Sequence, residues 1–244
     1  MSKLSTARIA GTTAGTLVLA AMLLSGCTAT PVEPTSPTTV VSEPATPTPE
    51  PVIDPIDTVV ALVARPESLE LRDASGLVVI ELDYLGDPAA AVATIAQVLD
   101  ETPVDEEYPG SNHHSPSTAH RWGAFELWER RYVDRWADFA AQDRTLHLPS
   151  FGIVLTGPDV AGVALTTEQG VVAGSSWSDL EAMPGLQVNP SGCSGPYLDF
   201  TTRDETWPDG TVHEQRYGVD FIANSDISII ERVRAPLAIQ DGCA

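Results

Sequence analysis

The sequence predicts an α+β fold in which antiparallel sheets are accompanied by two or three helices. Short apolar or alternating runs bounded by turn residues recur along the chain, and such runs are typical of strands. Only a few segments combine a capping residue with apolar side chains three and four positions apart, as helices require. Residues 58–244 have the length and apolar content of one compact domain or of two small fused ones.

The first elements are predicted to be strands. The run Thr58–Ala64 is continuously apolar or β-branched, which favours a strand. Two further runs, Leu69–Arg72 and Leu77–Leu82, flank a polar turn that ends in Gly76. This arrangement predicts a β-hairpin.

Two helices are predicted from capping residues followed by helical spacing. Asp87 can cap a helix that has Pro88 in its first turn and ends before Pro103. The apolar face of this helix consists of Val92, Ile95, Val98 and Leu99. Ser175 or Ser176 can cap a second helix. The apolar face of the second helix consists of Trp177, Leu180 and Met183.

Most of the remaining pattern predicts strands. Large apolar residues on both faces of Trp122–Trp128 predict one central strand. Tyr132, Trp136 and Phe139 have the spacing of a short aromatic-faced helix. Further extended runs are Phe151–Leu155, Val163–Thr167, Tyr197–Thr201, Thr211–Ile222 and Ile227–Val233.

Residues 1–26 have the pattern of a lipoprotein signal peptide. The run Ile9–Leu24 is apolar or small, and Ser25-Gly26 follow it directly before Cys27. This ending resembles the lipobox of bacterial lipoproteins. The resemblance implies a diacylglyceryl group on the Cys27 thiol, further acylation by palmitate, and retention at the outer face of the cytoplasmic membrane. A transmembrane helix is the alternative, but the run is shorter than the ~20 residues that a span needs.

The segment 27–57 is predicted to be a stalk that begins at the lipidated cysteine. It is rich in Pro and Thr, so it favours extended polyproline II backbone at about 3.1 Å per residue. The chain has a formal net charge of −21, and loss of Lys3 and Arg8 with the leader makes the charge more negative. This charge argues against nucleic acid as a partner and favours a cationic one.

Cys193 and Cys243 form an even pair once Cys27 is lipidated. A disulfide is expected in an exported protein, and the closed loop is worth ~4 kcal/mol in the chain-entropy model. A catalytic thiol or a two-cysteine metal site is the alternative, but no histidine supports either nearby in the sequence.

Two clusters are candidate sites. His113, His114 and His120 follow an acidic run, and imidazoles with carboxylates can hold zinc. Their spacing matches no metal motif, so capping or solvent-facing histidines are expected, with no metal and no cofactor. The second cluster is a possible surface for an envelope protein or a glycan, and its alternative is packing at the edge of the core. Its residues are Trp128, Arg131, Tyr132 and Trp136.

The segments Gly170–Leu180 and Arg121–Leu127 resemble uncharacterised actinobacterial lipoproteins, in which a glycine-start helix and a Trp-Gly strand recur together. The pattern is similar, more distantly, to the tandem helix-plus-sheet repeats of the β-lactamase inhibitory protein and of small outer-membrane assembly lipoproteins. The resemblance implies a binding module, with repeats near 58–156 and 157–244.

The expected function is binding without catalysis, at the cell surface. The sequence contains no G-x-S-x-G elbow, no P-loop and no dinucleotide fingerprint, and residues 58–244 contain no lysine for a Ser-x-x-Lys site. An envelope-associated hydrolase acting on cell-wall polymer or exported peptides is the alternative, because a pair of carboxylates leaves no sequence signature.

Overall fold

The computed structural model describes residues 54–111, 115–131, 149–189, 192, 194–206 and 211–239, all within one compact unit, Glu50–Ala244. Several predicted residues lie outside the described ones. They are Cys27, His113, His114, Tyr132, Trp136, Cys193 and Cys243.

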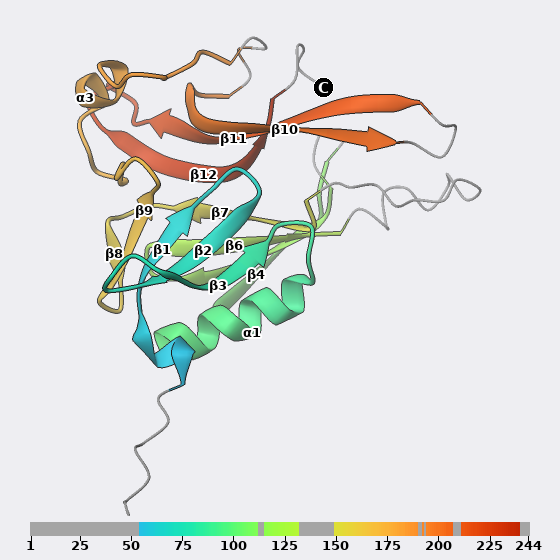
Figure 1. The fold of residues 1–244 in the computed structure, drawn as a ribbon, viewed down its shortest axis with the longest axis vertical. Coiled ribbons are helices and arrows are strands. Elements are labelled where there is room, and N and C mark those ends of the chain that lie inside the picture. Colours follow the sequence, from blue (N-terminus) through green and yellow to red (C-terminus); the bar gives the residue numbers. More distant parts are fainter. Residues whose placement is uncertain are drawn as a thin grey trace, which may run out of the picture. The chain divides into compact units, whose positions relative to one another are not determined.

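The α+β prediction is confirmed, with mostly antiparallel strands (Figure 1). A 3-10 helix η1 (Pro55–Thr58) and two α-helices, α1 (Pro88–Leu99) and α3 (Trp177–Glu181), accompany twelve strands in the described residues. The strands are β1 (Val59–Ala64), β2 (Ser68–Asp73), β3 (Val78–Asp83), β4 (Val104–Tyr108), β5 (Ser117–Trp122), β6 (Phe125–Arg130), β7 (Phe151–Leu155), β8 (Asp159–Val160), β9 (Val163–Thr167), β10 (Tyr197–Thr206), β11 (Val212–Ala223) and β12 (Ile230–Ala238).

The strands form two sheets. Sheet A has the order β3-β2-β1-β9-β8, and sheet B has the order β10-β11-β12-β7-β6-β5-β4. The pair β1–β9 is parallel, whereas β12 pairs with β7 in the antiparallel direction. Each sheet therefore contains strands from both predicted sub-repeats. The sub-repeats themselves stay a prediction, although α1 precedes β4–β7 and α3 precedes β10–β12.

Local sequence explains the first helix and the first hairpin. The Asp87 carboxylate accepts a hydrogen bond from the Ala89 amide, and Asp100, the residue directly after α1, has a left-handed φ of 48°. In the β2–β3 turn, the Asp73 carboxylate accepts from the backbone amides of Ser75 and Leu77. Both predicted elements are confirmed.

The single central strand predicted over Trp122–Trp128 is wrong. Trp122 ends β5 and pairs with Phe125 at the start of β6, with a tight turn between them. Gly123 permits this turn because its φ of 56° lies in the left-handed region. Large apolar side chains lie on both sides of Gly123 and Ala124 because β5 ends and β6 begins there.

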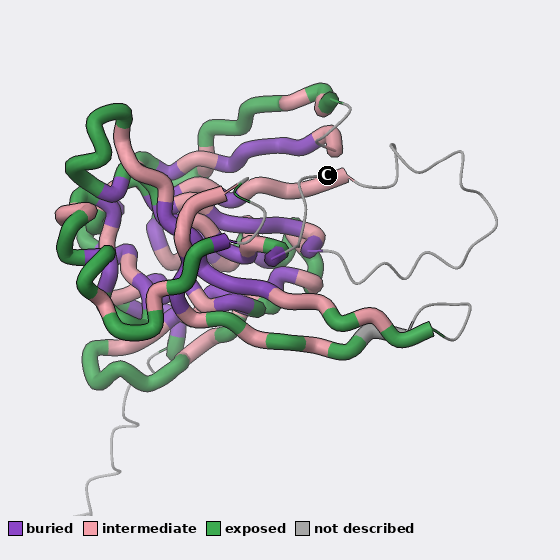
Figure 2. The backbone as a smooth tube through the Cα atoms, turned by 90° about the horizontal axis from the view of Figure 1, so that it is seen from above, coloured by how far each residue is buried: buried purple, intermediate pink, exposed green. Residues whose placement is uncertain are grey.

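The core includes residues of both sheets and α1, and Figure 2 shows buried backbone through the middle of the domain. Trp122 is fully buried, and its indole Nε1 donates to the carbonyl of Glu101, just beyond α1, at 2.8 Å. Tyr84 and Phe151 pack edge to face with ring centroids 5.4 Å apart. The hydrogen bond of Trp122 connects the residues after α1 to β5 of sheet B.

Replacing Trp122 by alanine should lower the free energy of unfolding by about 3–5 kcal/mol, since it removes a buried ring and an indole hydrogen bond. Leu77→Ala is the control, because Leu77 is exposed, and it should change stability by less than ~0.5 kcal/mol. Urea unfolding followed by circular dichroism measures both. Equal losses would show that Trp122 does not have this central packing role.

Candidate functional site

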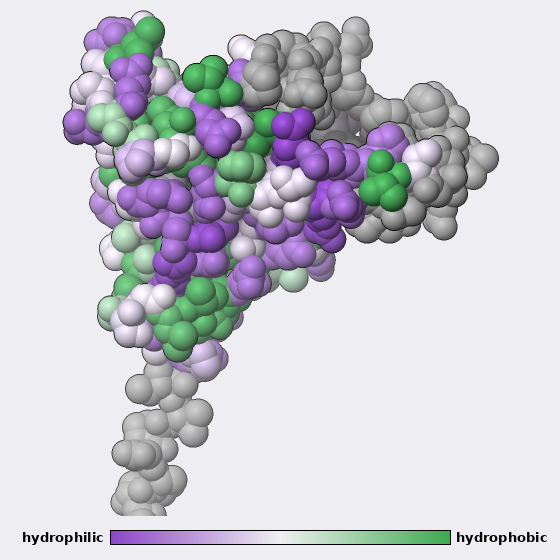
Figure 3. Space-filling view, turned by 45° about the horizontal axis from the view of Figure 1, so that its top comes forward, coloured by the Kyte–Doolittle hydropathy of each residue, from purple (hydrophilic) through white to green (hydrophobic). Residues whose placement is uncertain are grey.

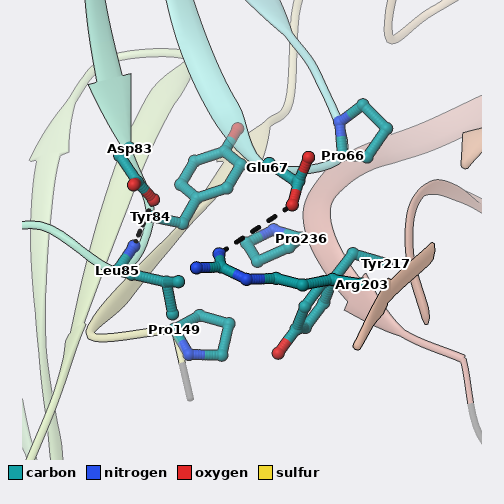
Figure 4. Close-up of a pocket in the computed structure, with 9 residues that line it drawn as sticks. All are labelled: Pro66, Glu67, Asp83, Tyr84, Leu85, Pro149, Arg203, Tyr217 and Pro236. Atoms are coloured by element: carbon teal, nitrogen blue, oxygen red, sulfur yellow. Dashed lines mark hydrogen bonds and ion pairs between the residues drawn. The ribbon is translucent and has the colours of Figure 1, made fainter. Parts of the chain in front are cut away.

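An open hollow lies over the ends of β2 and β3. It has a volume of about 420 Å³ and is lined by Glu67, Ser68, Glu81, Asp83 and Arg203. A smaller pocket adjoins it and shares Glu67, Asp83 and Arg203 (Figure 4). The remaining walls of this pocket are apolar or aromatic, from Pro66, Tyr84, Leu85, Pro149, Tyr217 and Pro236.

Strand alternation directs the polar side chains toward the hollow. Leu69 and Leu71 of β2 belong to the buried core, so Ser68 and Glu70 point to the opposite, outer face of sheet A. The register pairs Ser68 with Asp83 and Glu70 with Glu81. These four polar residues therefore lie on one face of the β2–β3 hairpin.

Glu70 and Glu81 lie directly opposite each other, and like charges in that position destabilise a sheet. The Glu70 carboxylate forms ion pairs with Arg72 and with Arg65. Within the described residues Glu81 has neither an ion pair nor a hydrogen bond. Asp83 uses one carboxylate oxygen to accept from the Leu85 amide at 2.8 Å, and no described cation pairs with it.

Arg203 is the only basic side chain that lines the hollow in the described part of the chain. Figure 4 shows its side chain crossing the pocket toward Glu67, and the closest approach of the two charges is 4.0 Å. Both side chains are 40% exposed or more, so the pair contributes little stability, about 0–1 kcal/mol. No hydrogen bond from the Arg203 guanidinium is formed with a described residue.

An ionic network adjoins the hollow on the same side of sheet A. The Arg65 guanidinium lies 2.7 Å from Glu168 and 3.3 Å from Asp199 Oδ2, and Arg72 contacts both Glu70 and Glu168. Burial raises the pKa of the Asp199 carboxyl, and the Arg65 charge opposes this effect. This network neutralises Glu70 and leaves Glu81 as the unpaired member of the cross-strand pair.

Two residues of the predicted aromatic surface, Trp128 and Arg131, lie in the described part of the chain. Trp128 stacks with Tyr108 on the outer face of sheet B, with ring centroids 4.8 Å apart, and the Arg121 guanidinium lies 5.6 Å from the Trp128 ring. Arg131 instead bonds Thr118 and Glu107, whose side chains lie on the other face of the same sheet. Trp128 and Arg131 therefore do not share a surface.

His120 is buried between two carboxylates. Its Nδ1 lies 2.7 Å from Asp105, and its Nε2 lies 3.4 Å from Glu129. Both ring nitrogens are therefore engaged, which leaves neither directed at a ligand. Among the residues that the structure describes, no three His, Cys, Asp or Glu side chains are arranged to hold a metal ion.

The hollow was not predicted. A signal that could have indicated its polar side is the alternation of Leu69 and Leu71 with polar residues in Ser68–Asp73. The position of the hollow depends on Arg203, which only the tertiary fold brings to Glu67. In the described part of the chain no helix has both the length and the hydropathy to cross a bilayer. Comparisons of the chain with protein-family models, with curated proteins and with solved structures find no match.

Replacing Asp199 by asparagine should change how stability depends on pH. The folded pKa of Asp199 is raised, so this carboxyl contributes stability below its unfolded pKa, and the contribution is lost as pH rises through the folded pKa. Wild type should therefore gain unfolding free energy relative to Asp199→Asn as the pH is lowered from about 7 to about 3.5. Urea unfolding at each pH measures the difference.

Asp226→Asn is the matched control with the opposite sign. A hydrogen bond from Ser228 lowers the pKa of Asp226, so wild type should lose unfolding free energy relative to this variant over the same pH range. The same trend in both variants would contradict the environment described for Asp199.

Proposed function

We propose that this protein is a lipid-anchored surface protein whose domain binds a cationic partner in the hollow over β2 and β3. The observation that supports this proposal is that Glu81 and Asp83, which have no cationic partner among the described residues, line an open hollow together with Ser68. A ligand with ammonium or guanidinium groups would satisfy these oxygens.

Binding is favoured over hydrolysis by the arrangement of the lining residues. A nucleophilic hydroxyl needs a base within hydrogen-bond distance, and Ser68 makes no hydrogen bond with any described side chain. The hollow is also open and polar, whereas catalytic acids are usually tuned in water-excluded sites. The proposed role is therefore recognition, with no chemical step.

The overall charge supports the same proposal. A chain of net charge −21 attracts cationic partners over a distance of about one Debye length, ~8 Å at physiological salt. Figure 3 shows hydrophilic side chains over much of the visible face of the domain. Attachment through Cys27 and the Pro/Thr-rich segment would hold this surface outside the membrane.

The first test compares peptide binding by wild type and by the double variant Glu81→Gln, Asp83→Asn. The mature full-length chain in neutral detergent is titrated with hexalysine by calorimetry. We expect the double variant to bind about tenfold more weakly, which corresponds to ~1.4 kcal/mol. The isosteric changes keep the shape of the hollow and remove only its charge.

The control is the double variant Asp159→Asn, Asp179→Asn, because both residues are exposed and lie away from the hollow. It changes the net charge of the chain by the same amount. Equal weakening in both double variants would contradict the proposed site, since it would show that hexalysine responds only to overall charge.

A second test concerns the anchor. Replacing Cys27 by serine removes the thiol that would receive lipid, so the variant should lose acyl label from radioactive palmitate and should not be recovered as a processed membrane form. Cys193→Ser should retain the label. Retention of label by Cys27→Ser would contradict lipidation at this residue.

A further inference from the structure

We infer that the contact between Asp199 and Arg65 is a pH-sensitive switch, which sets how closely β10 approaches the turn between β1 and β2. A proton on Asp199 would hold β10 against this turn, and loss of the proton would loosen the contact. The inference goes beyond the proposed function, because it concerns the walls of the smaller pocket and involves no ligand.

The smaller pocket lies between this turn, residues 65–67, and strands of sheet B. Glu67 belongs to the turn, whereas Arg203 and Tyr217 come from β10 and β11. Among the described residues, two ion pairs join β10 to the turn. Arg203 approaches Glu67 to 4.0 Å (Figure 4), and Asp199 Oδ2 lies 3.3 Å from Arg65 Nε. These two contacts link the pocket wall formed by β10 to the wall formed by the turn.

The local backbone directs Asp199 toward the turn. The register of β10 with β11 shifts between Leu198 and Phe200, so Asp199 is the extra residue of a β-bulge. Its φ of 48° lies in the left-handed region, which aspartate and asparagine tolerate better than most residues. A bulge changes the direction of the side chain that it carries, and here the carboxylate contacts Arg65 of the other sheet.

Asp199 is the acid of the ionic network with the least compensation. The network has three carboxylates for two guanidinium groups, from Glu70, Glu168, Asp199, Arg65 and Arg72. Glu70 and Glu168 each contact both arginines, whereas Asp199 contacts only one of them. Asp199 Oδ2 is buried and accepts no hydrogen bond from a described residue. A proton on this carboxyl removes the excess negative charge and makes the carboxyl a hydrogen-bond donor.

The groups around Asp199 favour the uptake of this proton. Burial raises the pKa of the Asp199 carboxyl, and the Arg65 charge opposes this effect. The charges of Glu168 and Glu70 raise the same pKa further. Tyr84, which follows β3 and lies beside Arg65, stays neutral because burial raises the pKa of its hydroxyl. The other groups near Asp199 therefore keep their charges while Asp199 titrates.

Separation of β10 from the turn would expose the Asp199 carboxyl to water, where its pKa returns toward the ordinary value of about 3.9. The closed arrangement therefore binds the proton more tightly than the open one. By linkage, closure is fully favoured below the ordinary pKa, and it weakens as pH rises through the raised pKa of the closed arrangement.

The experiment measures the opening of the pocket by nuclear magnetic resonance, with a neutral gadolinium chelate as the relaxation agent. The isotope-labelled mature chain is studied in neutral detergent. The amides of Leu85 and Tyr217 are the reporters, because both residues line the pocket, and the exposed Leu77 is the reference. As the pH is lowered from about 7 to about 4.5, we expect the relaxation enhancement of both reporters to fall about twofold in wild type.

Asp199→Asn should remove this pH dependence. Asparagine has the shape of the neutral carboxyl and tolerates the left-handed backbone, so the variant should stay closed at both pH values. Asp226→Asn is the matched control, because Asp226 lies outside the network and a hydrogen bond from Ser228 lowers its pKa. This control should follow wild type. The pH dependence of wild type, if it persisted in Asp199→Asn, would overturn the inference.

Glu168→Gln tests the electrostatic cause. This change removes a negative charge near Asp199, so the midpoint of the opening transition should move to lower pH. A merely structural role of Glu168 would lower stability without moving the midpoint. An unchanged midpoint, or a wild-type pocket whose opening does not vary with pH, would overturn the inference. Cation binding by the hollow is judged separately, because this experiment contains no ligand.

Discussion

The burial of one face of the β2–β3 hairpin determines on which side of sheet A the charged residues of these two strands lie. Leu69 and Leu71 pack fully buried in the core, and each such side chain contributes about 1.5–3 kcal/mol of burial energy. Because successive side chains of a strand point to opposite faces, Ser68 and Glu70 then point to the outer face. A shift of register by one residue would expose the leucines, so the polar outer face follows from the core.

On that outer face some carboxylates have a cationic partner and others do not, because arginine is scarce in this chain. The chain has 13 basic residues against 34 acidic ones, so only some carboxylates can have a cationic partner. Arg65 and Arg72 lie in the network with Glu70, Glu168 and Asp199. The acids of β3 are left without such a partner among the described residues. The small number of basic residues thus leaves carboxylates on β3 that are open to an external cation.

The sequence predicted those elements whose signals are local. The Asp87-Pro88 start of α1 and the turn ending in Gly76 depend on capping and turn chemistry within a few residues, and the structure confirms both. The turn at Gly123 was not predicted, because apolar residues on both sides of it make β5 and β6 resemble one continuous strand in the sequence. Trp128 and Arg131 are close in sequence, but their side chains lie on opposite faces of sheet B. The approach of Arg203 to Glu67 was not predictable either, because it depends on the pairing of strands that are distant in the sequence.

The most direct test of the central claim is a nuclear magnetic resonance titration of the isotope-labelled mature chain with hexalysine. If the hollow is the binding site, the largest amide shift changes will occur at Ser68, Glu81, Asp83 and Arg203. The largest changes at Tyr108, Arg121 and Trp128, or small changes spread over all acidic residues, would contradict it.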